Sequence, residues 1–135
     1  MEPRWIDRVV ADAIHLDQIR EHGGLAGVRD ENALEAALAR PRQKRNYGPR
    51  TSIPALAAAY GFGLSRGHRY RDANKRVSFL VMVVFLELNG WRFTATEAEV
   101  VEAMVALASG ALDEPALADW LAERCKKPKG RGSSK

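Results

Sequence analysis

The feature that most constrains this chain is an apolar run of twelve residues, VSFLVMVVFLEL, from Val77 to Leu88. Only Ser78 and Glu87 interrupt it, so apolar side chains occupy every face of a helix and not one stripe. A helix that is apolar all round is typical of a buried position. The run is too short to cross a bilayer, which takes about 20 residues. It therefore predicts a buried central helix.

The stretch directly before this run, residues 67–76, is GHRYRDANKR. Lys75 and Arg76 fall in the first helical turn, where the partial positive charge of the helix favours acids and each cation costs about 0.3–1 kcal/mol. One interpretation is that both are solvated surface residues. Free N–H groups, the positive helix end and two long cations also form an anion site suited to phosphates, and this is the interpretation we favour.

Two further groups lie within nine residues of these cations. His68 carries an imidazole, the side chain most often used to accept or donate a proton at neutral pH. Asp72 offers the hard oxygen ligands that Mg²⁺ prefers, together with substrate phosphates. Taken singly, His68 is read as a surface or capping histidine and Asp72 as a helix N-cap. Together with the amide of Asn74, they predict a phosphate-handling site.

Residues 68–76 resemble the motif of the Fic/Doc superfamily, which in the Doc branch reads H-x-F-x-D-[A/G]-N-K-R. The likeness extends to Ile14-His15, to residues 21–24 and 27–30, and to later segments, and covers about residues 5–124. It identifies the chain as similar to the Doc-type (death-on-curing) toxins. Two departures are Tyr70 in place of Phe, whose buried hydroxyl needs a partner, and Gly67 in place of Asn or Ser.

The resemblance implies an ATP-dependent protein kinase. Fic proteins transfer AMP and have Gly where this chain has Lys75; in the Doc branch the nucleotide is reversed and the γ-phosphate is transferred. The implied target is a threonine of elongation factor Tu, and its modification blocks translation. We expect His68 to take the hydroxyl proton and Asp72 to hold Mg²⁺. Asn74 would orient phosphate oxygens, and Lys75 and Arg76 would stabilise the transferred phosphoryl group.

The basic segment 41–51, PRQKRNYGPRT, is predicted to be an irregular loop because Tyr47, Gly48 and Pro49 are turn signals. Its charges are read either as solvated or as part of the Fic flap, which lines up the target segment beside the active site. If the flap carries over, Arg45, Tyr47 and Arg50 position the target in an extended, strand-like conformation.

Periodicity and capping signals predict an all-α fold, a compact bundle of about six helices, as the resemblance also implies. The expected helices are listed here in order: 5–21, stopped by Gly23-Gly24; 31–40, capped by Asp30 and ended by Pro41; 53–66; the central helix; 97–109, opened by a Thr96/Glu99 capping box and closed by Gly110; and 115–125, capped by Asp113. His15 and His22 have no partners at catalytic or metal spacing and are read as structural.

With 135 residues the chain is predicted to form one domain, residues 1–125, followed by a disordered basic tail, 126–135. The tail holds five of the 21 Lys and Arg residues, which leaves 16 basic and 17 acidic residues in the domain. Neither nucleic acid nor a membrane is therefore expected as a direct partner. A lone cysteine, Cys125, and the absence of a signal peptide favour the cytoplasm.

Control is expected from outside the chain. Some Fic proteins carry an inhibitory helix with Ser or Thr four residues before Glu, and no Ser or Thr here has Glu at that spacing. The resemblance thus implies a separate cognate antitoxin, docked as a helix in a groove. Three alternatives stay open: an AMP transferase, a non-catalytic antitoxin-binding module, and a nucleic-acid binder that uses the basic loop and tail.

Overall fold

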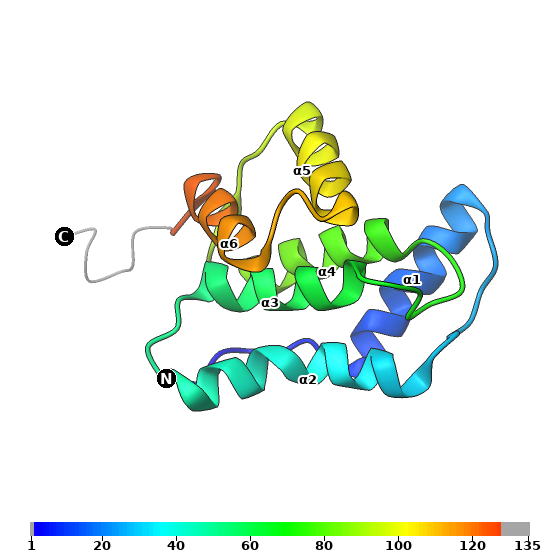
Figure 1. Cartoon of the computed structure of the whole chain (residues 1–135), viewed down its shortest axis with the longest axis horizontal. Helices are drawn as coiled ribbons and strands as arrows, with labels where there is room; N and C mark the ends of the chain where they lie inside the picture. The colour runs from blue at the N-terminus through cyan, green and yellow to red at the C-terminus, as the bar shows by residue number, and fades with distance from the viewer. Residues whose placement is uncertain (1, 128–135) are drawn as a thin grey trace.

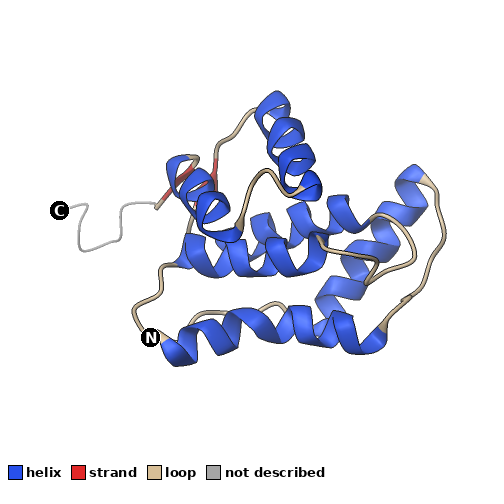
Figure 2. Cartoon of the chain, viewed as in Figure 1, coloured by secondary structure: helices blue, strands red, loops and turns tan. Residues whose placement is uncertain are grey.

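A computed structural model describes residues 2–127, and within them the chain forms six helices and one two-stranded sheet (Figures 1 and 2). The elements in order are α1 Arg8–His22, α2 Glu31–Tyr47, α3 Ile53–Ser65, α4 Asn74–Leu88, β1 Arg92–Phe93, α5 Glu97–Ser109, α6 Glu114–Glu123 and β2 Cys125–Lys126. The predicted all-α class is confirmed. No helix of the described part has the length and apolar character that a membrane crossing requires.

Helices α3 and α4 share the centre of the molecule. α2 packs on one side of α3, α6 packs on another, and α1 packs against α4 (Figure 1). The two central helices approach closely at Gly61, where a Cβ atom would lie 2.1 Å from Sδ of Met82. Ser78 closes this contact by donating a 2.8 Å hydrogen bond to the carbonyl of Gly61. The apolar run therefore packs directly against α3, and Ser78, one of its two polar residues, lies in that contact.

The central helix α4 is fully buried along one face only, although its sequence is apolar on every face. Its fully buried side chains lie on one face: Val77, Ser78, Val81, Met82, Phe85 and Leu86. The other apolar positions are half-buried, except Leu88, which is 43 % exposed. α3 is covered more completely, since Leu56 to Tyr60 are all fully buried. The site loop, which connects α3 to α4, is thus held between the two best-anchored helices.

The predicted end of α2 at Pro41 is wrong, because the helix continues through the proline to Tyr47. Proline in a helix interior removes one hydrogen bond and costs about 3 kcal/mol or more. Here its ring is buried, and the following turn is tied to α6 by the ion pair of Lys44 with Glu114 at 3.3 Å. Tertiary contacts therefore outweigh the local signal, and the predicted loop 41–51 shrinks to the residues between α2 and α3.

The two ends of the described part of the chain make tertiary contacts that periodicity does not predict. α1 starts at Arg8 and not at residue 5, because Ile6 leaves the helix and donates its N–H to the buried hydroxyl of Tyr60 at 2.9 Å. Lys126, predicted as the first tail residue, pairs with Arg92 in the antiparallel sheet. The predicted tail otherwise falls mostly on residues 128–135, which lie outside the described residues.

Candidate active site

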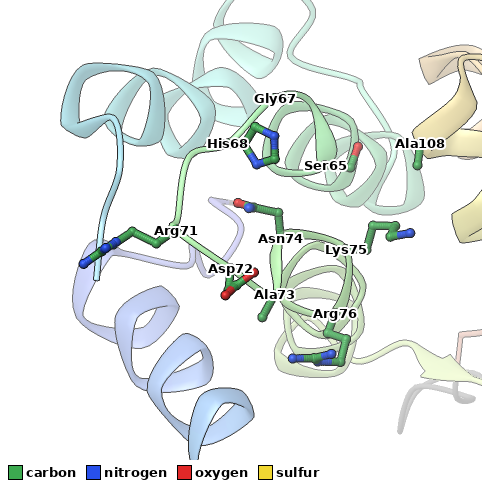
Figure 3. Close-up of a pocket in the computed structure, with 10 residues that line it drawn as sticks. All are labelled: Ser65, Gly67, His68, Arg71, Asp72, Ala73, Asn74, Lys75, Arg76 and Ala108. Atoms are coloured by element: carbon green, nitrogen blue, oxygen red, sulfur yellow. The ribbon is translucent and has the colours of Figure 1, made fainter. Parts of the chain in front are cut away.

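A hollow of about 430 Å³ lies at the N-terminal end of α4, where the loop from α3 enters the helix (Figure 3). The residues that line it include the five predicted to act on the phosphates and the target hydroxyl: His68, Asp72, Asn74, Lys75 and Arg76. The His68 ring points toward the first turn of α4, and Lys75 and Arg76 extend from that turn (Figure 3). The structure thus brings a base, a carboxylate and two cations to one cavity.

The first turn of α4 has unusually free backbone donors. Its N-cap, Ala73, has φ 66° and ψ 20°, and no side chain in the described part of the chain caps the helix. The first helical hydrogen bond is donated by Val77 to Ala73 at 2.9 Å, and within residues 2–127 the three N–H groups before it have no partner. Uncapped N–H groups and the helix dipole favour a bound anion.

Asp72 is therefore not the N-cap, and its carboxylate is held by another segment. Its Oδ2 accepts a 2.8 Å hydrogen bond from the N–H of Leu25, which leaves Oδ1 without a hydrogen bond to any described residue. Gly24 allows this approach, because it has φ 115° and a Cβ there would lie 3.2 Å from Oδ2. One carboxylate oxygen of Asp72 is thus fixed by the backbone, and the residue lines the hollow.

The amide of Asn74 is already used within the protein. Its Oδ1 accepts from the N–H of Tyr70 at 2.9 Å, and its Nδ2 donates to the Tyr70 carbonyl at 2.9 Å. These two bonds hold the motif loop against the start of α4. The predicted contact of Asn74 with phosphate oxygens would have to use the second amide hydrogen, and the main effect of this side chain is to shape the loop.

Tyr70 anchors the motif loop in the core. Its side chain is 1 % exposed, its ring stacks on His15 with 4.1 Å between centroids, and its hydroxyl donates to Oδ1 of Asp12 at 2.9 Å. Asp12 is held in turn by Nε of Arg8 at 2.9 Å. Burial and the contact with Asp12 raise the pKa of the Tyr70 hydroxyl, which stays protonated. Asp12 is not predicted from the sequence, where the only signal for it is that a buried Tyr70 hydroxyl needs a hydrogen-bond partner.

His15 fits the predicted structural role. It is 4 % exposed, and its Nε2 has no hydrogen-bond partner among the described residues. Burial lowers the pKa of this imidazole, and a hydrogen bond with the backbone of Asp72 only partly opposes the shift. A neutral His15 ring therefore packs against Tyr70 and helps to hold the motif loop in place.

Comparison with known proteins agrees with this geometry. The model of the Fic/DOC family matches residues 5–86. The chain belongs to the Fic/DOC family. "Protein kinase doc" of Escherichia phage P1 is 31 % identical over 109 residues, which cover 81 % of this chain and 86 % of that protein. "Toxin Doc" of Mycolicibacterium smegmatis is 41 % identical over 76 residues, 54 % of this chain and 57 % of that protein.

The segment that lies beside the Fic/DOC motif differs from the one predicted. Residues 23–30 run along the motif loop, and Val28 forms an antiparallel bridge with Tyr70. The bridge has two 3.0 Å bonds, from Arg71 N–H to the Gly27 carbonyl and from Arg29 N–H to the Arg69 carbonyl. The N–H and carbonyl of Val28 form no hydrogen bond with described residues. A strand-like edge therefore borders the site.

The residues predicted to position the target lie elsewhere. Tyr47 ends α2 and is 93 % exposed, Arg50 lies in the loop that follows, and Arg45 pairs with Glu2 at 3.2 Å. This end of α2 is opposite the end of α3 that leads into the motif loop (Figure 1). The 13 residues of α3 span about 20 Å between the two ends. The structure does not bring these three residues to the pocket.

A metal ion at this site would need ligands from the substrate as well as from the protein. Among residues 2–127, no cluster of three or more His, Cys, Asp or Glu side chains could hold a metal. One carboxylate with a free oxygen is nevertheless the typical protein contribution to a Mg²⁺ that also binds substrate phosphates. Asp72 fits that role for a metal carried by a nucleotide.

Proposed function

We propose that this protein is the toxin of a toxin–antitoxin pair and transfers the γ-phosphate of ATP to a threonine hydroxyl of a translation factor, elongation factor Tu. The observation that carries the proposal is the joint presence of His68, Asp72, Lys75 and Arg76 around one hollow at an uncapped helix start. Membership of the Fic/DOC family and the likeness to "Protein kinase doc" support a transferase of this type.

Each side chain has a role that its position supports. His68 accepts the proton of the threonine hydroxyl while the Oγ–phosphorus bond forms and the bond to ADP breaks. Lys75, Arg76 and the free N–H groups of the first turn stabilise the charge on the transferred phosphoryl group, which is where most catalysis of phosphoryl transfer lies. Mg²⁺, when bound, neutralises charge on the ATP phosphates. Asp72 supplies the oxygen that would hold it.

The edge of Val28 supports a way to hold the target. Its free N–H and carbonyl can pair with an extended segment of another protein, as in strand addition to a sheet edge. This edge belongs to the same loop that fixes Asp72 through Leu25. A docked segment would therefore lie beside the pocket that holds the phosphates. The cognate antitoxin would act by covering this region or the nucleotide site.

The test uses ATP labelled on the α- or γ-phosphate with purified elongation factor Tu. We expect the γ-label on threonine with the wild-type protein and none with His68→Ala, whose fold and ATP binding stay intact. The matched control is His22→Ala, because His22 is exposed at the end of α1 and should transfer normally.

Other outcomes would replace this function. Transfer of the α-label would show an AMP transferase. Binding of the antitoxin with neither label transferred to any protein of a cell lysate would indicate a non-catalytic module. Wild-type transfer by His68→Ala would show that the assigned base is wrong.

A further inference from the structure

A second hollow, of about 480 Å³, lies on the other side of the motif loop. It is lined by Leu25, Val28, Arg29 and Arg71. Arg71 also lines the catalytic pocket, so the two hollows are neighbours. Its side chain points away from His68, toward the segment that carries Arg29 (Figure 3). The proposed chemistry at His68 does not use this hollow.

The two arginines of this hollow carry free charge. Within the described residues, neither guanidinium forms an ion pair or a hydrogen bond. Arg8, Arg40 and Arg124, by contrast, each pair with a carboxylate. Both arginines are exposed, so they can reach a partner.

The backbone fixes where these two charges stand. The N–H of Arg29 bonds to the Arg69 carbonyl and the N–H of Arg71 bonds to the Gly27 carbonyl, both at 3.0 Å. These bonds flank the Val28–Tyr70 bridge, so the backbone of both arginines is tied across the two segments. Gly27 lies beside this side chain, since a Cβ on it would be in ordinary contact with Cδ of Arg71 at 3.4 Å.

We propose that this hollow binds an acidic side chain of the protein substrate, close in sequence to the hydroxyl that is phosphorylated. The inference rests on the proposed function and names a preference of the same site. Guanidinium groups bind carboxylates through paired, charge-assisted hydrogen bonds. An extended segment paired with Val28 advances about 3.3 Å per residue, so an acid and an acceptor a few residues apart reach neighbouring hollows.

The lining favours a protein over a nucleic acid. Leu25 and Val28 supply the apolar part of the hollow, and none of the residues that line it is aromatic. Single-stranded nucleic acids are usually held by aromatic side chains on which the bases stack. A free backbone edge with two arginines beside it matches an extended acidic peptide better.

The binding test needs no catalysis. Two fluorescein-labelled peptides of 12 residues, each with one central threonine, differ only in Glu or Gln at the flanking positions, and their affinity is measured by fluorescence anisotropy without ATP. We expect the Glu peptide to bind at least ten-fold more tightly to the wild-type protein. High salt should weaken this preference, because exposed charges are screened. Equal affinities for the two peptides would overturn the proposal, whether or not the protein is a kinase.

Variants then assign the preference to the hollow. Arg29→Gln and the double variant Arg29→Gln/Arg71→Gln should lose most of it, while their thermal unfolding stays that of the wild type. The matched control is Arg4→Gln/Arg92→Gln, which removes two exposed arginines near the other end of α4. Loss of the preference in the control variant alone would contradict the assignment to this hollow. Tighter binding of a single-stranded RNA of 12 nucleotides than of the Glu peptide, lost in Arg29→Gln, would contradict it as well.

Kinetics separate this inference from the proposed function. If γ-phosphate transfer occurs, Arg29→Gln should raise KM for the Glu peptide about ten-fold and change kcat little. If the Glu peptide binds selectively and no label is ever transferred, the acidic preference stands and the kinase function fails. Transfer to both peptides with equal KM would leave the kinase function and remove the preference.

Discussion

The starts of α4 and α5 are built in opposite ways. At α5, the Thr96 hydroxyl accepts the N–H of Glu99 at 3.2 Å, and the Glu99 carboxylate accepts the N–H of Thr96 at 2.9 Å. At α4, Ala73 offers no capping side chain, and Lys75 and Arg76 occupy the first turn. One helix start satisfies its own donors, and the other leaves them open.

The difference shows what each helix start contributes. The bonds from Thr96 and Arg124 lower the pKa of Glu99, as expected for a carboxylate that stabilises the fold. The start of α4 gives up that stabilisation, and two cations add repulsion with the helix dipole. Stability lost at a functional site is a common cost of function. The open donors at α4 are therefore the part of the fold best suited to a phosphate group.

Among changes at the two helix starts, the largest effect is expected from removing a cation at α4. Arg76→Ala should lower the rate of γ-phosphate transfer about 100-fold, the usual loss for one donor that stabilises developing charge. Its free energy of unfolding should stay the same or rise by about 0.3–1 kcal/mol, because one unfavourable dipole contact disappears.

The matched change at α5 is Glu97→Ala, which removes an exposed acid from its first turn. It should lower stability slightly and leave transfer unchanged. Transfer assays and urea unfolding of both variants test the contrast, and equal activity losses would show that the two helix starts do not differ in function.

A smaller effect is expected from the cap of α5. Thr96→Ala should cost about 1 kcal/mol of stability, because one N–H loses its partner. Thr96→Ser keeps the hydroxyl and should restore most of the loss. Urea unfolding measures both values, while peptide phosphorylation should not change. A fall in kcat for Thr96→Ala would mean that α5 takes part in the reaction.

The strained cap of α4 gives a still smaller effect of opposite sign. Ala73 has φ 66°, a conformation that costs an L-residue about 1–2 kcal/mol. Ala73→Gly should therefore stabilise the protein by roughly 0.5 kcal/mol, since the greater freedom of unfolded Gly offsets part of the gain. Ala73→Val should destabilise it. Thermal unfolding of the three proteins orders them, and a less stable Gly variant would contradict the assigned strain.

The smallest expected effect is on the pH dependence of stability, to which His15 beneath the motif loop and Glu99 at the start of α5 contribute in different pH ranges. The folded pKa of His15 lies below its ordinary 6.5, so the unfolded chain binds more protons and stability falls as the pH drops below about 6.5. The pKa of Glu99 lies below its ordinary 4.5, so its contribution is lost only at lower pH.

The variants for this test are His15→Phe, which keeps a ring on Tyr70, and His22→Gln, which changes an exposed histidine. Urea unfolding between pH 7 and about 5 should show a weaker pH dependence for His15→Phe and an unchanged one for His22→Gln. An unaltered slope in His15→Phe would exclude His15 as the source.

Local signals predicted most of the helices and their ends. The capping box of Thr96 and Glu99, the stop at Gly110 and the caps Asp30 and Asp113 all appear as expected. These signals work because a cap bonds to N–H groups three residues away. The helix end predicted at Pro41 is wrong, because the residues next to the proline do not show how its ring and the following turn pack.

The sequence by itself determined the helical class and which residues make up the motif, because both depend on residues close together in the chain. Only the tertiary structure decided what holds that motif. The N–H of Leu25 donates a hydrogen bond to Asp72, 47 residues away in the sequence. Asp12 accepts a hydrogen bond from the Tyr70 hydroxyl, 58 residues away. Tertiary packing likewise placed the segment 23–30, and not 41–51, beside the site. Contacts of this range follow from the packing of α1, α3 and α4, which no local pattern specifies.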